Sequence, residues 1–205
     1  MSGDFQSAFE AWLDFLHGLG FAARAHLNPP ATEAEIAAVE AEIGFQLPED
    51  LRALYLRADG QKHFDRIADP APGTIVTPLF GGCEFVPLAR AMEDYRSWEE
   101  MIDDWNADDD PNFSITLRPG DPPVAREYWR RGWFAFALDG GGNACSVDLS
   151  PVPGGTRGQI ILTGPDEDER KVLAPSLTAF LVEAAKCEPI WEEGDGPLRF
   201  FEIEL

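Results

Sequence analysis

Acidic side chains gather along one stretch of this sequence, and carboxylates at such density can bind a cation or a basic protein surface. At about 100° per residue, Glu93, Ser97, Glu100 and Asp104 form one stripe of a helix. We expect Arg96, four residues before Glu100, to offset a little of this charge. The candidate partner-binding residues are Glu93, Glu100, Asp103, Asp104, Asp108, Asp109 and Asp110.

The position of these acids favours a binding surface over an ordinary solvated face. Asp103 and Asp104 lie near the predicted end of the helix, where a negative charge costs roughly 0.3–1 kcal/mol against the helix dipole. A run of charge is by default a solvated face, and that alternative stays open. Because this face is nearly single-signed and locally unfavourable, we interpret it as a surface that binds a basic partner.

The same carboxylates match the first half of a calcium loop, beginning at Asp104. The sixth position of such a loop needs glycine for a sharp turn, and the twelfth needs a bidentate glutamate. This sequence has Asp109 and Ile115 at those positions, which excludes an EF-hand. A looser cation site among the carboxylates remains an alternative, and no metal-ligand set is predicted.

Signatures of catalysis are missing from the sequence. It contains no GxSxG elbow, no HExxH and no GxxxxGK[ST] loop. The three histidines, His17, His26 and His63, lack metal-ligand spacing. A Cys83–His63 nucleophile pair rests on residue type alone. We therefore predict no catalytic residue and no cofactor, and we expect the chain not to be an enzyme.

Two further features that suggest a ligand are better explained as turns. Gly140–Gly142 lead into a strand and not into a helix N-terminus, so a turn with left-handed backbone is favoured over a phosphate cradle. Asp148 precedes Pro151 by three residues and is expected to accept hydrogen bonds from local amides.

Three consecutive strands are predicted between Trp133 and Thr163. The run 133–138 is apolar throughout and should be buried on both faces. The run 143–149 alternates in the manner of a half-buried strand, and 159–162 is short and β-branched. Together these runs predict a β-meander at the centre of one sheet.

Helices and shorter strands surround this meander in the predicted order. Thr32 and Glu35 form a capping box at the start of one helix, and Gly44 ends it. The predicted helices are 4–19, the segment from Thr32 to Gly44, the segment from Pro48 to Asp59-Gly60, 88–105, and the segment after Ser176. Short strands are predicted at 75–79 and 84–86 as a hairpin around Gly81-Gly82, and at 113–117 and 172–174. We expect a single α+β domain over 1–188 and a tail over 189–205, where Phe200 to Ile203 can add an edge strand.

The composition excludes several classes of partner. The chain carries 37 acids and 16 bases, a formal net charge of −21, which repels nucleic acid and anionic membrane. The odd, widely spaced Cys83, Cys145 and Cys187 indicate a reducing compartment. No run approaches ~18 apolar residues and the N-terminus has no basic leader, so we expect a cytoplasmic protein.

A series of short motifs resembles the SUKH superfamily, which includes fungal cell-wall assembly regulators and bacterial immunity proteins. The matching residues, in order, are Ala34-Glu-Ile36 with Glu40, Leu47-Pro-Glu-Asp-Leu51, Ala58-Asp-Gly60, Leu79-Phe-Gly81, Phe85-Val-Pro-Leu88, Trp133-Phe134, Asp139-Gly-Gly-Gly-Asn143, Asp148-Leu-Ser-Pro151, Gly158-Gln159 and Ala174-Pro-Ser176. The resemblance implies helices packed on a central, largely antiparallel sheet and no catalytic residues.

Two functions follow from charge and resemblance together. The leading hypothesis is an immunity protein that neutralises a basic protein toxin, such as a nuclease, through the acidic surface. The alternative is a signalling or scaffold protein of the cell-wall assembly regulator type, with no toxin partner. Neither involves direct binding of nucleic acid or membrane.

Overall fold

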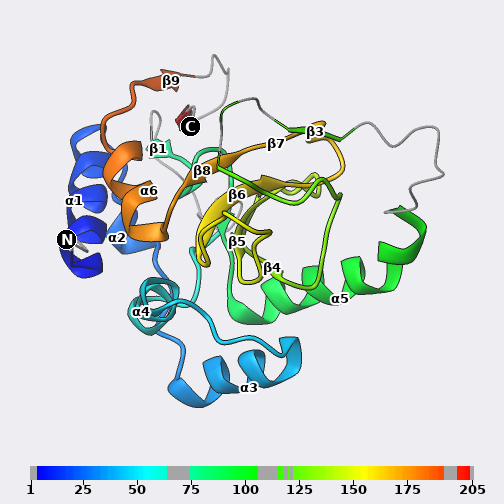
Figure 1. Ribbon diagram of the computed structural model, residues 1–205. Helices are drawn as coiled ribbons and strands as arrows, with labels where there is room; N and C mark the ends of the chain where they lie inside the picture. The colour runs from blue at the N-terminus through cyan, green and yellow to red at the C-terminus, as the bar shows by residue number, and fades with distance from the viewer. Residues whose placement is uncertain are drawn as a thin grey trace.

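The protein is an α+β fold built on an antiparallel sheet (Figure 1). The computed structural model describes residues 4–63, 74–105, 115–117, 120, 122–191 and 198–203, with the side chains of all but 103–105 and 198–203. The main sheet has the order β2-β4-β5-β6-β8. Its strands are β2 (Glu84–Phe85), β4 (Trp133–Leu138), β5 (Ala144–Asp148), β6 (Gln159–Thr163) and β8 (Val172–Ala174). Because β4, β5 and β6 pair in sequence order and antiparallel, the predicted meander is confirmed.

Two smaller sheets lie beside the main one. One joins β1 (Thr74–Val76), β10 (Leu198–Ile203) and β9 (Pro189–Trp191), with β10 in the middle. The tail strand is therefore central and not at an edge. The other pairs β3 (Thr116–Leu117) with β7 (Glu169–Arg170).

The turn of the hairpin predicted around Gly81-Gly82 is present, but the predicted pairing of its two strands is wrong. Only an isolated bridge joins Phe80 to Cys83, while β1 pairs in parallel with β10 and β2 pairs with β4. The physical reason is that both short strands find longer partners, brought by parts of the chain distant in sequence.

Helices cover one side and one end of the sheet. They are α1 (Phe5–Gly18), α2 (Ala23–His26), α3 (Glu33–Ile43), α4 (Glu49–Arg57), α5 (Leu88–Trp105) and α6 (Leu177–Ala184). Figure 1 shows α1 beside α6, α5 running below β4, and α3 apart from the sheet. The predicted capping box is present, since the Thr32 side chain accepts from Glu35 N while the Glu35 side chain accepts from Thr32 N.

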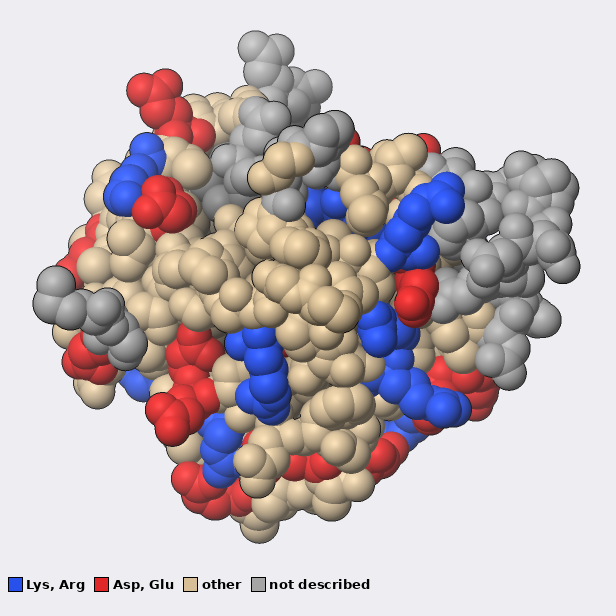
Figure 2. Space-filling view, in the orientation of Figure 1, with Lys and Arg blue, Asp and Glu red and all other residues tan. Residues whose placement is uncertain are grey.

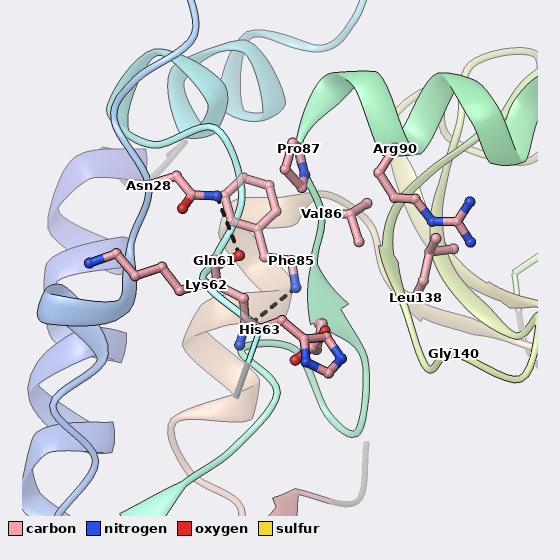
Figure 3. Close-up of a pocket in the computed structure, with 11 residues that line it drawn as sticks. Asn28, Gln61, Lys62, His63, Phe85, Val86, Pro87, Arg90, Leu138 and Gly140 are labelled. Carbon is pink, nitrogen blue, oxygen red and sulfur yellow. Dashed lines mark hydrogen bonds and ion pairs between the residues drawn. The ribbon is translucent and has the colours of Figure 1, made fainter. Parts of the chain in front are cut away.

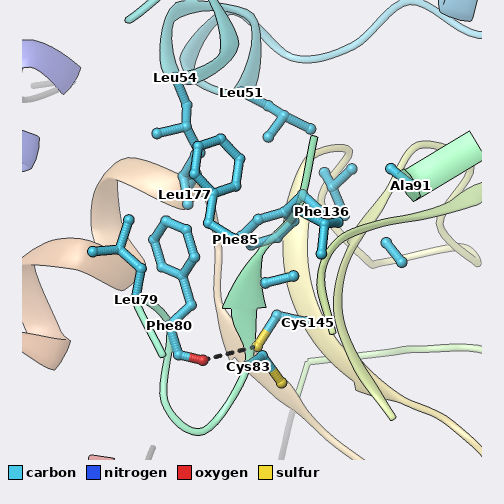
Figure 4. Packing of buried hydrophobic residues seen from close by; sticks show 14 of the residues in the cluster. Leu51, Leu54, Leu79, Phe80, Cys83, Phe85, Ala91, Phe136, Cys145 and Leu177 are labelled. Carbon is cyan, nitrogen blue, oxygen red and sulfur yellow. Dashed lines mark hydrogen bonds between the residues drawn. The ribbon is translucent and has the colours of Figure 1, made fainter. Parts of the chain in front are cut away.

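The main core lies between the helices and one face of the sheet (Figure 4). The Phe80 ring meets Phe85 and Phe136 edge-on, with ring centroids 5.7 and 5.3 Å apart. Leu51 and Leu54 of α4 close this cluster from above in the view. Such edge-to-face pairs add about 0.5–1.5 kcal/mol each beyond the burial of area.

The opposite face of the sheet is also covered, which corrects the half-buried prediction for 143–149. Ala144, Ser146 and Asp148 are all buried. Val124 and Ala125 pack over this face against Trp133 and Ile161. Several of its polar groups bond to one another: the hydroxyls of Ser146 and Thr163 lie 2.8 Å apart, and Asp148 accepts from Ser150 N and Gln159 Nε2 at 3.1 Å each. The first of these bonds to Asp148 confirms its role as a turn former.

Candidate functional site

Helix α5 is placed by its apolar stripe. Leu88, Ala91, Tyr95 and Trp98 are buried against the sheet and Ile102 is half-buried, as the spacing predicts. The Tyr95 hydroxyl donates to the carbonyl of Arg131 at 3.1 Å, which ties the helix to the turn before β4. Burial raises the pKa of Tyr95, so the phenol remains a neutral donor. The opposite side of the helix faces solvent.

The exposed side of α5 is less single-signed than expected. Arg90 Nη1 lies 3.3 Å from Glu93 Oε2, and Arg131 Nε lies 2.9 Å from Glu99 Oε1. Figure 2 shows Lys and Arg side chains beside Asp and Glu at several places around a broad uncharged area of the visible face. Part of the negative charge is therefore balanced by the chain itself.

Arg96 does not offset Glu100, contrary to expectation. Its Nε and Nη2 donate to Glu42 Oε1 and Oε2 at 2.7 and 2.9 Å, forming a bidentate pair with α3. A planar guanidinium matches a carboxylate best in this geometry, whereas Arg before Glu at four residues is the weaker arrangement within a helix. The hydrogen bond from Arg96 lowers the pKa of Glu42.

The seven candidate partner-binding residues are only partly located. Glu93 and Glu100 are exposed on α5. Asp103 and Asp104 belong to the last turn of α5, whose side chains are not described, and Asp108, Asp109 and Asp110 lie outside the described residues. The surface as a whole therefore stays a prediction.

Asp94 is a carboxylate on α5 that the sequence reasoning passed over. It is half-buried, and burial raises its pKa to about 6, partly opposed by the charge of Arg90. Its spacing on the helix places it between the apolar and acidic stripes. That position is the sequence signal for a partly buried carboxylate.

A groove between α3 and α5 is a further feature that the sequence did not reveal. This α3/α5 groove has a volume of about 380 Å³. It is lined by Glu35, Ala38, Val39, Glu42, Asp59, Leu88, Ala89, Met92, Glu93 and Arg96. Apolar residues form its floor and acids form most of its rim.

A second hollow of about 410 Å³ lies at the β2 edge of the main sheet (Figure 3). His63 Nε2 lies 3.5 Å from Glu84 Oε2, and Lys62 Nζ donates to the carbonyl of Ala25 at 2.9 Å. Arg90 lines the opposite side. None of its described lining residues carries a hydroxyl or a thiol, so these walls place no Ser, Thr, Tyr or Cys beside the His63–Glu84 pair.

The Cys83–His63 pair gains no support from the structure. Cys83 is buried beside Cys145 in the core, whereas 44% of the His63 side chain is exposed. The neighbouring Cys83 thiol and burial raise the pKa of Cys145 well above its ordinary value, so this thiol stays protonated. All three cysteines are free thiols.

The glycine loop is a turn, as predicted. Asp139 Oδ1 accepts from Gly141 N at 2.6 Å and from Asn143 N at 3.0 Å. Gly140 and Gly142 have φ of 87° and 109°. Two of the loop's amides are thus occupied by the chain's own carboxylate, which favours a turn over a phosphate cradle.

Within the described ranges, no group of three or more His, Cys, Asp or Glu side chains is arranged to hold a metal ion. In the same part of the chain, no helix has the length and apolar character needed to cross a membrane.

The fold is that of an α+β domain, with helices arranged around a meander. The model of the SMI1 / KNR4 family (SUKH-1) matches residues 30–183. The chain belongs to this family, which confirms the resemblance seen in its motifs.

Curated relatives are named as regulators. The cell wall biosynthesis/cell cycle regulator smi1 of Schizosaccharomyces pombe is 31% identical over 162 residues, covering 76% of this chain and 30% of the relative. The glucan synthesis regulatory protein of Neurospora crassa is 27% identical over 188 residues, covering 78% of this chain and 34% of the relative. The cell wall assembly regulator SMI1 of Saccharomyces cerevisiae is 24% identical over 186 residues, covering 78% and 36%. The chain thus spans about a third of the length of these relatives.

Proposed function

We propose that this chain is a protein-binding module that regulates cell-wall assembly and acts by holding a partner, not by catalysis. The observation that carries the proposal is the match of residues 30–183 to a family whose curated relatives are named as regulators of cell-wall or glucan synthesis. The regulators named above support a signalling module better than the toxin-neutralising function, which was the leading hypothesis from charge.

The acidic side of α5 is the proposed contact surface. Glu100 is exposed, and the net charge of −21 steers basic partners towards the protein over about a Debye length of ~8 Å at physiological salt. Exposed charges at the edge of an interface act mainly on the association rate and its salt dependence.

Deletion of the gene in its own organism tests the function. We expect the deletion strain to become hypersensitive to an inhibitor of cell-wall glucan synthesis, and the wild-type gene to restore resistance. A deletion strain that keeps normal resistance, but is killed by a toxin from neighbouring cells, would establish the immunity function instead.

A charge-matched pair of variants tests the surface separately. The double variant Glu100→Lys with Asp104→Lys should fail to restore resistance. The control, Glu49→Lys with Glu188→Lys, makes the same change in net charge at two exposed acids, one at the start of α4 and one after α6. If both double variants restore resistance equally, the regulatory function stands and this surface is wrong.

A further inference from the structure

The α3/α5 groove exists because two helices present alanine where they face each other. Ala38 on α3 and Ala89 on α5 are both exposed and line opposite walls. Val39, Leu88 and Met92 lie beneath them with 4–7% of their surface exposed. Because the walls are small, these largely buried side chains form an apolar floor between the two helices, and a floor methionine can adapt its shape to a side chain placed on it.

Interactions within the chain fix the two helices that form the groove. The bidentate Arg96–Glu42 pair joins α5 to α3 across it. Asp59, beneath the rim, accepts a hydrogen bond from the first amide of α5, which fixes that helix relative to the end of α4. A preformed groove lowers the ordering cost of binding.

The charge of the rim is negative. Glu35, Glu42 and Glu93 surround the floor, and the lining has one base, Arg96, which pairs with Glu42. Arg90, outside the lining, lies near Glu93 and balances part of its charge. Hydrogen bonds from Thr32 lower the pKa of Glu35, and the bond from Arg96 lowers that of Glu42. Both carboxylates are therefore ionised at neutral pH.

Size and charge together select the occupant. The groove, of about 380 Å³, is at the lower end of the roughly 300–1,000 Å³ range of small-molecule sites, and it has room for one or two side chains. Amphipathic segments bind grooves between helices by placing apolar anchors on the floor. Lys or Arg beside such an anchor would meet the carboxylate rim, whereas acidic flanks would be repelled.

We propose that the α3/α5 groove binds a basic amphipathic segment of a partner protein, with one large apolar side chain on the Val39–Met92 floor and Lys or Arg residues at the rim. The inference rests on the proposed function as a binding module and names the chemistry of its partner. It also extends the binding surface from the exposed stripe of α5 to the α3 side, through Glu93.

The probe is a fluorescein-labelled helical peptide with leucines at i, i+4 spacing and lysines elsewhere. Its control has glutamates in place of the lysines. Fluorescence anisotropy at about 50 and about 200 mM salt should show saturable binding of the lysine peptide, weaker at high salt, and no binding of the glutamate peptide. Failure of the wild-type protein to bind the lysine peptide overturns the proposal.

Two matched pairs of variants locate the binding. Ala38→Trp fills the groove and should weaken binding by about tenfold or more, whereas Ala37→Trp, on an exposed neighbour outside the lining, should change it by less than about twofold. Glu42→Lys should weaken binding more than Glu49→Lys, at an exposed acid outside the lining, although both change the net charge equally. Equal effects within both pairs overturn the proposal, because binding would then lie elsewhere or follow net charge alone.

Separate controls test whether each variant folds and whether the proposed function holds. Circular dichroism checks each variant, and Ala89→Trp fills the groove from the other wall if Ala38→Trp does not fold. If the peptide does not bind but the wild-type gene restores wall resistance, binding in the groove is overturned and the proposed function stands. If the peptide binds in the groove but deletion of the gene leaves wall resistance unchanged, the proposed function is overturned and binding in the groove stands.

Discussion

Asp59 Oδ1 accepts a hydrogen bond from the main-chain N–H of Leu88 at 2.7 Å. Asp59, in the Asp59-Gly60 turn that follows α4, therefore caps α5, the helix that carries the candidate surface. Asn28 Nδ2 donates to the carbonyl of Asp59 at 2.9 Å and holds the turn from its other side. The Asp-Gly motif recognised in the sequence thus has a structural role, which is to fix where α5 begins.

Removing this cap should destabilise the fold. Asp59→Ala leaves the first amide of α5 without its side-chain acceptor, and we expect a loss of about 1 kcal/mol, within the roughly 0.5–2 kcal/mol range of helix N-caps. Asp59→Asn keeps an oxygen acceptor and should lose less. Urea unfolding monitored by tryptophan fluorescence measures both, and equal losses would show that the oxygen does not act as a cap.

Gly60 should tolerate no side chain. Its φ is +83°, and a Cβ there would lie 2.5 Å from Pro87 N, a backbone atom that cannot move aside. Gly60→Ala combines conformational strain with a clash, so we expect a loss above about 3 kcal/mol or no folding.

Gly44 provides the matched control for this substitution. Its φ is +75°, and a Cβ there would meet nothing within 4 Å. Gly44→Ala should cost only about 1–2 kcal/mol of conformational strain. Comparable midpoints of thermal unfolding for the two variants would contradict the clash at Pro87.

Local signals explain which parts of the fold could be predicted. The Thr32–Glu35 capping box and the left-handed Gly44 act within a few residues, so α3 begins and ends where its sequence indicates. The 88–105 helix matches α5 because its apolar spacing is long and regular. The motifs also identified the family, because their order along the chain is more specific than any one of them.

Non-local contacts explain what could not be predicted. The alternation in β5 has the period of a half-buried strand, but Val124 and Ala125 cover its polar face. Arg96 was assigned to its own helix because spacing within a helix is visible in sequence, whereas the approach of Glu42 depends on how α3 packs. The α3/α5 groove has the same origin, since exposed alanines become walls only when two helices face each other.

Arg170 should be among the residues least tolerant of substitution. It is fully buried, and its guanidinium donates to the carbonyls of Glu127, Tyr128, Gly164 and Glu167 at 2.6–3.2 Å. Burial lowers its pKa to about 10, so it remains charged at neutral pH. Arg170→Met would remove the guanidinium donors from all four carbonyls, and we expect a loss of about 3 kcal/mol or more.

A conservative change at Arg170 separates geometry from charge. Arg170→Lys keeps the charge but cannot reach acceptors on several sides, so it should still lose about 2 kcal/mol. Arg57→Lys is the control, because 46% of the Arg57 side chain is exposed, and it should change stability by less than about 0.5 kcal/mol. Urea unfolding compares them, and a neutral Arg170→Lys would show that the guanidinium fork is dispensable.

Asp94 should make the stability of the protein fall as pH rises from about 4 to about 6. Burial raises its pKa to about 6 from the ordinary 3.8, so the folded state holds its proton more tightly than the unfolded state. Below the unfolded pKa the group is protonated in both states and costs nothing. As pH rises through the folded pKa, a charge forms in a desolvated position and stability is lost.

The variant Asp94→Asn isolates this effect from the other acids. At pH 7.5 it should be more stable than the wild type by about 1–2 kcal/mol, less than the full shift implies because solvent reaches part of the carboxylate. At pH 3.5 the difference should vanish. Glu188→Gln, at an exposed position between α6 and β9, should show no comparable pH-dependent gain. Urea unfolding at both pH values decides the matter, because a gain of equal size at pH 3.5 would arise from packing and not from the buried charge.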